Sequence, residues 1–142
     1  MTASEAEPAA GPEVLIVEDD RFNVRLLSEA CRAAGLQVRV AMDGQEGLDE
    51  ALRDPPALML LDLMLPRLDG FGVLERLRAD ARTEDVPVIL VTAVSDAATR
   101  ARGVELGADD FVTKPFRLAD LRVRMQALLD QRALEQSLLD DG

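Results

Sequence analysis

Short apolar runs alternate with longer segments of helical periodicity along this chain of 142 residues. The third run, "ALMLL", is continuously apolar, which is typical of a strand buried on both faces. The runs occupy residues 14–17, 37–41, 57–61, 86–92 and 110–113. Because a helical segment follows each run, the pattern predicts five βα units, which form a parallel sheet with helices on both faces.

Start and stop signals place the helices between these runs. Gly35 and Gly107 stand where two helices are expected to end, and Pro55-Pro56 ends another. The expected helices cover about residues 22–34, 45–53, 70–77 and 96–106, with a last one from 118 onward. Phe22 is the first of the apolar residues that recur at helical spacing in the first helix.

The composition excludes several kinds of chemistry. Histidine is absent and Cys31 is the only cysteine, so the chain has no internal disulfide, Cys/His zinc site, Ser-His-Asp triad or phosphohistidine. With a net charge of −11, it is not expected to bind nucleic acid directly. No apolar run approaches the ~18 residues of a membrane span, and the N-terminus has no signal-peptide pattern. We therefore expect a cytoplasmic protein without a membrane contact.

Polar side chains follow the apolar runs at the expected carboxyl edge of the sheet, where ligands of such folds bind. Glu18 and Asp19 follow the first run, and Asp62 follows the third. Thr92 ends the fourth run, and Lys114 follows the fifth. If the first and third strands are neighbours, the three carboxylates converge. Two unit charges about 4 Å apart repel by roughly 4 kcal/mol at an effective dielectric constant near 20.

Such a carboxylate cluster must protonate or bind a cation. Hard oxygen ligands with room for water suit Mg²⁺ or Mn²⁺. We expect Lys114 to supply a counter-charge on the other side of Asp62, at a sheet edge where Asp62 need not be buried. A carboxylate flanked by a metal and a lysine is suited to phosphoryl transfer onto an aspartate.

Other residues near these motifs have structural explanations. Asp20 and Asp69 suit helix N-caps. Cys31 is expected in the core, because it falls on the apolar face of the first helix. Asp109 and Asp110 are expected to be exposed loop charges.

In the order and spacing of its motifs, the chain resembles the receiver domain of bacterial two-component response regulators. The resemblance covers roughly residues 13–129 and rests on "VLIVEDD", "LLDLMLPRLDGF", "VILVTA" and "DDFVTKPF". It implies a flavodoxin-like (βα)5 fold, a doubly wound parallel sheet with strand order 2-1-3-4-5.

The resemblance also implies a role for each matching residue. Asp62 would be the phosphoacceptor. Glu18 and Asp19 would be the acidic pair that helps to hold Mg²⁺, with Asp19 the more direct ligand. The backbone carbonyl of Met64 would complete the protein's share of the metal shell. Lys114 would pair with the phosphoryl group, and its peptide bond to the following proline would be cis.

Thr92 and Phe111 match the switch residues of this family. Thr92 would hydrogen-bond the phosphoryl group, and its movement would open space for Phe111 to turn inward. The surface of the fourth helix, fifth strand and fifth helix would then signal to an output domain or a downstream protein. Phe111 lacks the hydroxyl of the family's frequent Tyr, so its switching would be steric. Glu18 stands where Asp is common, and its extra methylene is expected to favour a water-mediated role.

The implied function is a phosphoacceptor signalling domain and not an enzyme in the usual sense. A sensor histidine kinase or a phosphotransfer protein would phosphorylate Asp62, and the chain itself would only self-phosphorylate and slowly autodephosphorylate. Met64 lies two positions after Asp62, and Val94 lies two positions after Thr92. Neither side chain can orient an attacking water by a hydrogen bond, so we expect slow loss of the phosphoryl group.

Two other functions fit part of the pattern. A haloacid-dehalogenase-type phosphatase also phosphorylates an aspartate after a strand, but it usually has a second aspartate two residues later, where this chain has Met64. A pseudo-receiver that is not phosphorylated and acts as a protein-binding module would normally lack Asp62, the acidic pair or Lys114. All of these residues are present.

Three parts are expected along the chain: a flexible lead-in over residues 1–12, a receiver domain over 13–129, and a helical extension or linker over 130–142. The extension either leads into the output domain of a longer protein or ends a single-domain regulator that acts through protein contacts. Apolar residues near heptad spacing, interrupted by Arg132 and Glu135, leave homodimerisation through the last helix as a further alternative.

Overall fold

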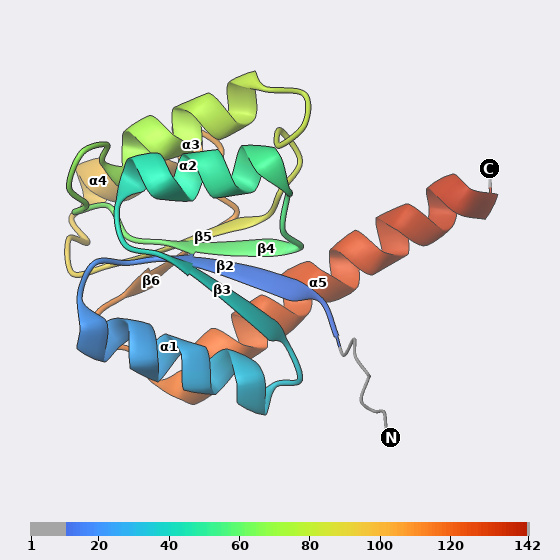
Figure 1. Ribbon diagram of the computed structural model, residues 1–142, viewed down its shortest axis with the longest axis horizontal. Helices are drawn as coiled ribbons and strands as arrows, with labels where there is room; N and C mark the ends of the chain where they lie inside the picture. Colours follow the sequence, from blue (N-terminus) through green and yellow to red (C-terminus); the bar gives the residue numbers. More distant parts are fainter. Residues whose placement is uncertain (1–10, 142) are drawn as a thin grey trace.

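The computed structural model describes residues 11–141, in which five strands alternate with five helices (Figure 1). The strands are β2 (Glu13–Val17), β3 (Gln37–Ala41), β4 (Leu58–Leu61), β5 (Val88–Thr92) and β6 (Asp110–Thr113). The helices are α1 (Arg21–Ala33), α2 (Gly44–Arg53), α3 (Gly70–Ala79), α4 (Ala97–Glu105) and α5 (Leu118–Asp141). The predicted βα units are therefore confirmed. The expected N-terminal lead-in falls outside the described residues except for its last two positions.

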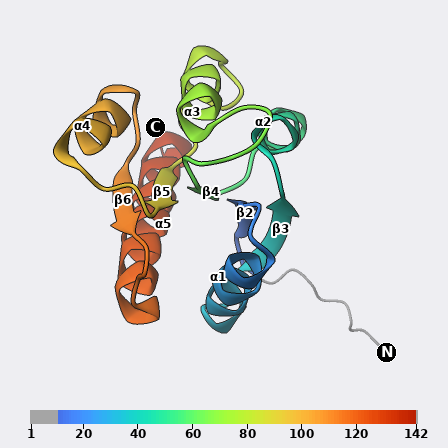
Figure 2. The same ribbon diagram turned by 90° about the vertical axis from the view of Figure 1, so that its left-hand side faces the viewer.

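The five strands form one parallel sheet in the order β3-β2-β4-β5-β6. In chain order this is 2-1-3-4-5, so the flavodoxin-like prediction is confirmed. Val17 pairs with Leu61 of β4, and Thr92 pairs with Thr113 of β6. Figure 2 shows the strands in this order, with β4 between β2 and β5. Residues that follow β2, β4 and β6 therefore emerge at one edge.

The helices cover both faces of the sheet, with α1 and α5 on one face and α2, α3 and α4 on the other (Figures 1 and 2). Alternate strand residues point to the two faces, so each strand contributes to two apolar clusters. One cluster contains Val17, Leu61 and Leu90 with residues of α2 and α3. The other joins Ile16 and Leu60 with residues of α1 and α5.

Cys31 lies in the α1 and α5 cluster, as predicted. Its side chain is fully buried, and its Sγ lies 3.8 Å from the sulfur of Met125. Burial raises the pKa of the Cys31 thiol to about 12. The thiol is therefore a neutral core group at physiological pH.

Aspartates begin the helices, as the sequence indicates. The Asp20 side chain accepts hydrogen bonds from the backbone N–H groups of Phe22 and Asn23 at 2.9 and 3.1 Å. Asp69 accepts from Gly72 at 2.9 Å. Before α4, Asp96 is the N-cap and accepts from the Thr99 N–H at 2.8 Å. These caps satisfy N–H groups that have no partner within the helix.

One apolar residue of α1 is exposed, and one positional prediction is wrong. Phe22 is 71% exposed, because the cap at Asp20 places it in the first turn of α1, beyond the edge of the sheet. Asp110 is not an exposed loop charge: it is half-buried as the first residue of β6 and pairs with Arg124 at 2.7 Å. Asp109 is an exposed loop residue as predicted, but its carboxylate accepts a hydrogen bond from the Val88 N–H at 2.8 Å.

Helix α5 runs for 24 residues, and its C-terminal part projects away from the sheet (Figure 1). Its buried side chains end at Leu129, while Leu134, Leu138 and Leu139 are exposed. The boundary predicted after residue 129 stays a prediction. Within residues 11–141, no helix combines the length and apolar character needed to cross a membrane.

Candidate functional site

The pairing of β2 with β4 brings the predicted acidic residues together. Glu18 and Asp62 each follow directly on one of these paired strands, and the Asp62 N–H donates to the Val17 carbonyl at 3.1 Å. Carboxylate oxygens of Glu18, Asp19 and Asp62 all lie within 4.8 Å of one another. The convergence expected from the sequence is therefore present.

Two of these three carboxylates are buried, and only Asp19 is exposed. Glu18 is 2% exposed and Asp62 is 6% exposed. The expectation that Asp62 need not be buried is wrong, because its neighbours close over it. The next residue, Leu63, is itself buried in the α2 and α3 cluster, and Lys114 covers the carboxylate from the β6 side.

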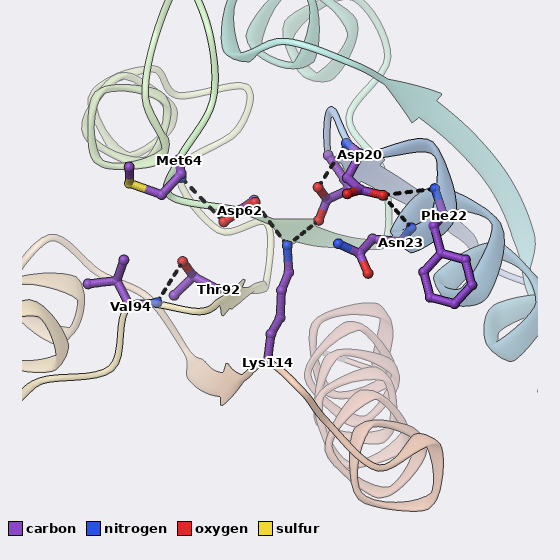
Figure 3. Close-up of polar contacts among 9 residues, drawn as sticks. Asp20, Phe22, Asn23, Asp62, Met64, Thr92, Val94 and Lys114 are labelled. Atoms are coloured by element: carbon purple, nitrogen blue, oxygen red, sulfur yellow. Dashed lines mark hydrogen bonds and ion pairs between the residues drawn. The ribbon is translucent and has the colours of Figure 1, made fainter.

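Lys114 bridges the two buried carboxylates (Figure 3). Its Nζ lies 2.6 Å from Glu18 Oε1 and 3.0 Å from Asp62 Oδ2. We expected the lysine on the far side of Asp62 from the acidic pair. That expectation is wrong, because the Glu18 side chain is long enough to contact Lys114, so the lysine pairs with Glu18 as well as with Asp62. Lys114 is the only lysine in the sequence.

The backbone after β6 aims the Lys114 side chain at this site. The Lys114 N–H donates to the Thr92 carbonyl at 2.9 Å, which continues the pairing of β6 with β5. The peptide bond between Lys114 and Pro115 is cis, as expected. The side chain then reaches over β5 and β4 to the residue after β2.

Burial and pairing act in opposite directions on the charges of the site. Burial raises the pKa of Glu18, although the hydrogen bonds from Lys114 and from the Asp20 N–H oppose this effect. Burial alone would lower the pKa of Lys114, but its contacts with Glu18 and Asp62 outweigh this and raise the pKa. The lysine therefore stays charged at neutral pH, and Glu18 takes up a proton more readily than an ordinary glutamate.

Two backbone N–H groups contact the site from the loops after β4 and β5. The Met64 N–H donates to Asp62 Oδ1 at 3.3 Å. The Val94 N–H donates to Thr92 Oγ1 at 3.3 Å, and Thr92 is fully buried. Figure 3 shows Thr92 and Val94 on the β5 side of Asp62, whereas Asp20 and Phe22 lie on the other side.

Phe111 lies inside the fold, not on its surface. It is 8% exposed and belongs to the apolar cluster beneath α2 and α3. The Arg100 guanidinium lies 4.6 Å from the centre of its ring and donates a hydrogen bond to the Thr113 hydroxyl at 3.2 Å. The sequence-based mechanism has this ring turning inward on phosphorylation, and in this structure it is already inward.

The donor set fits a small divalent cation. Three carboxylates within 4.8 Å of one another face a single lysine, which leaves an excess of negative charge. Carboxylate oxygens beside an exposed edge suit a cation that keeps several of its waters, as Mg²⁺ does. Asp19 is the exposed member and the carboxylate most open to solvent.

The exposed ring of Phe22 is a site feature that the sequence did not reveal. Figure 3 shows the ring projecting from the first turn of α1 on the side of Asp20. On the other side, Met64 is 66% exposed. One signal in the sequence could have indicated this exposure. Phe22 stands two residues after an N-cap aspartate, in the first turn of the helix.

Comparisons with known proteins agree with this geometry. Residues 14–126 match the family model of the response regulator receiver domain. The chain is 40% identical over 137 residues to the DNA-binding dual master transcriptional regulator RpaA of Synechocystis sp., which covers 92% of this chain and 57% of that protein. It is 43% identical over 115 residues to the response regulator PleD of Caulobacter vibrioides, covering 81% and 25%. The chain spans about half the length of the first of these curated relatives.

A solved structure extends the likeness to the fold. The receiver domain of sensor histidine kinase PA1611 from Pseudomonas aeruginosa, solved with a magnesium ion in its active-site cleft, is 31% identical to this chain. It superimposes with a TM-score of 0.80 and covers 85% of this chain and 99% of that one. With its acidic cluster, its parallel sheet and these relatives, the chain belongs to the family of response regulator receiver domains of two-component systems.

Proposed function

We propose that Asp62 accepts a phosphoryl group from a histidine kinase or a phosphotransfer protein, and that this modification switches the chain's contacts with an output domain or a downstream protein. The observation that supports this proposal most strongly is the buried Asp62 carboxylate, which contacts Lys114 and lies within 4.8 Å of oxygens of Glu18 and Asp19. Because the sequence has no histidine, the phosphohistidine donor lies outside these 142 residues.

Asp62 is the nucleophile of the proposed reaction. A carboxylate oxygen attacks the phosphorus atom in line, so that a P–O bond forms while the P–N bond to the donor imidazole breaks. Lys114 neutralises charge on the phosphoryl oxygens, and the Met64 N–H orients the carboxylate from the opposite oxygen. The protein contributes positions and charges, and in this sense it is not a classical enzyme.

The proposed metal ligands are the carboxylates of Glu18, Asp19 and Asp62 and the backbone carbonyl of Met64. Mg²⁺, or Mn²⁺ in its place, would neutralise the phosphoryl oxygens when bound there. Lys114 already pairs with Glu18 at 2.6 Å, so Glu18 would act on the cation chiefly through its charge and Asp19 would contact it directly.

Thr92 is proposed to couple the phosphoryl group to the surface of α4, β6 and α5. Its oxygen accepts a hydrogen bond from the Val94 N–H, so its own proton is available to a phosphoryl oxygen. Phe111 lies on the neighbouring strand β6, where it pairs with Leu90, and the Arg100 guanidinium lies over its ring. Phosphorylation is proposed to hold this inward arrangement of Phe111 and so to shift a pre-existing equilibrium.

The partners are proposed from the exposed residues around the site and from the relatives. Phe22 and Met64 offer apolar contacts for a phosphodonor protein on two sides of Asp62. We propose that residues 13–129 form the receiver and that residues 130–142 form an extension or linker. The signal would pass from the receiver to a further domain or to a partner protein, which produces the response. Homodimerisation through α5 is an alternative. A cytoplasmic setting is proposed from membership of the response regulator family.

The phosphoryl group is expected to be lost slowly, because Met64 and Val94 flank it with apolar side chains. Met64→Asn and Val94→Glu each introduce a group that can orient water, and each is expected to accelerate the loss by roughly 10-fold. The measurement is the decay of the phosphorylated protein after removal of the phosphodonor. Met64→Leu is the matched control and should decay like the parent chain. Unchanged decay in both polar variants would contradict this explanation.

Chemical trapping tests which residue is modified. After phosphorylation, borohydride reduces an aspartyl phosphate to homoserine, and peptide mass spectrometry locates it. We expect homoserine at position 62 alone. Homoserine at Asp19 or Asp69 in place of Asp62 would refute the assignment of the phosphoacceptor.

A further inference from the structure

The loop between β4 and α3, residues 63–69, has an unusual turn close to the acidic site. Arg67 has a φ of 70°, in the left-handed region that side chains other than glycine seldom occupy. The Pro66 carbonyl accepts hydrogen bonds from the N–H groups of Leu68 at 2.8 Å and of Gly44 at 3.3 Å. One of these bonds is local, and the other comes from the first residue of α2.

The N-terminus of α2 holds this turn from the side. Asp43, the N-cap, accepts from the Glu46 N–H through Oδ1 at 2.7 Å, and its Oδ2 lies 3.3 Å from Arg67 Nη1. A Cβ atom on Gly44 would lie 1.6 Å from the Leu68 carbonyl oxygen, so the two backbones touch where only glycine fits. Helix α2 and the loop are therefore fitted to each other at this point.

The same loop determines the surroundings of the phosphoacceptor. Its residue Met64 donates to Asp62 Oδ1 and supplies the carbonyl proposed as a metal ligand. The Gly70 N–H closes the loop on the Leu63 carbonyl at 3.0 Å, and a Cβ on Gly70 would lie 2.4 Å from the Asp62 carbonyl oxygen. A displaced turn at Arg67 would consequently move Met64 relative to Asp62.

We propose that Asp43 and Arg67 are positioning residues for the phosphorylation site: their ion pair holds the left-handed turn, and the turn places the Met64 carbonyl and orients the Asp62 carboxylate. This inference rests on the proposed function of Asp62. It assigns a role in metal binding and phosphoryl transfer to two residues that touch neither the metal ligands nor the phosphoacceptor.

The sign of the effect at Arg67 separates positioning from simple electrostatics. Removing a cation near a metal site strengthens cation binding if only the field matters, and removing an anion weakens it. Positioning predicts that Arg67→Ala and Asp43→Asn both weaken Mg²⁺ binding. Asparagine caps a helix as well as aspartate does, so Asp43→Asn removes the ion pair and keeps α2.

The experiment measures the Mg²⁺ dissociation constant by calorimetry and the rate of phosphorylation by acetyl phosphate at saturating Mg²⁺. We expect both Asp43→Asn and Arg67→Ala to bind Mg²⁺ about 10-fold more weakly, the low end of the range for groups that hold a metal ligand in place. The double variant should be no weaker than either single variant, and Arg67→Lys should recover most of the affinity. Melting temperatures serve as the test of intact folding.

Arg53→Ala is the matched control, because it removes an exposed arginine that pairs with Glu50 within α2. Its Mg²⁺ affinity should stay within twofold of the parent chain. Parent-like affinity in both test variants, or stronger binding in Arg67→Ala, would overturn the positioning role. If the parent chain binds Mg²⁺ with the expected variant pattern but is never phosphorylated, the proposed function fails and the positioning of the metal site stands.

Discussion

Replacing Lys114 with methionine is expected to lower the free energy of unfolding by about 3 kcal/mol at pH 7. The Lys114 ammonium is the cation that pairs with both Glu18 and Asp62, and these carboxylates are only 2% and 7% exposed in their side chains. Methionine keeps much of the apolar volume of the stem but leaves two buried negative charges together. The loss measured in urea unfolding is therefore mainly electrostatic.

The pH dependence of this loss follows from Glu18. Burial already raises its pKa above the ordinary 4.5, and loss of the lysine removes one of the contacts that lower it. A carboxyl group with a raised pKa in the folded state favours folding fully below its unfolded pKa, and this contribution is lost as the pH rises through the folded value. The deficit of Lys114→Met should thus shrink as the pH falls from 7 towards 4.5, and Mg²⁺ at pH 7 should restore part of it.

Arg117→Met is the matched control for the lysine variant. It removes an exposed cation three residues along the same segment and should change stability by no more than about 0.5 kcal/mol. A Lys114→Met deficit that is equal at pH 4.5 and at pH 7 would show that lost packing, and not unpaired charge, explains the effect.

Replacing Arg78 with alanine is expected to cost about 3 kcal/mol of stability. The Arg78 side chain extends from the end of α3 and binds the opposite edge of the sheet from the acidic site. It donates to the Gly107 carbonyl at 2.8 and 3.1 Å, to the Val86 carbonyl at 2.7 Å and to Asp109 at 3.1 Å. Truncation removes all of these hydrogen bonds at once, and only Asp109 keeps another of its own, from the Val88 N–H, so the cost exceeds that of a surface arginine.

Arg76→Ala, an exposed neighbour on α3, is the control for the arginine variant. We expect a change within about 0.5 kcal/mol in the same urea unfolding experiment. Arg78→Lys should recover little, because one ammonium cannot reproduce the fork that serves several carbonyls. A loss of less than 1 kcal/mol in Arg78→Ala would contradict this role.

The fold was predictable because its signals are local. Continuous apolar runs such as residues 58–61 identify strands buried on both faces, and aspartates such as Asp69 identify helix starts. The site was predictable in outline for the same reason, since Glu18 and Asp62 stand directly after strands. The order of the strands, which brings those two residues together, came from resemblance to a family and not from these local patterns.

The remaining features depend on how far side chains reach across the fold. Lys114 meets Glu18 only because its side chain reaches over two strands, β5 and β4. Phe22 is exposed because α1 begins beyond the sheet. Arg78 donates to backbone carbonyls such as that of Gly107, and Arg67 pairs with the carboxylate of Asp43. Both sets of partners come from distant segments of the sequence. No spacing along the sequence encodes those contacts, so no sequence pattern singled out either arginine.

Phosphorylation of Asp62 is tested most directly by the intact mass of the chain after incubation with acetyl phosphate and Mg²⁺. We expect the addition of one phosphoryl group. The same incubation with EDTA in place of Mg²⁺ should add none, and neither should incubation of Asp62→Asn with Mg²⁺. Asp69→Asn keeps an N-cap and should be phosphorylated like the parent chain. No mass change in the parent chain, or the same change in Asp62→Asn, would contradict Asp62 as the phosphoacceptor.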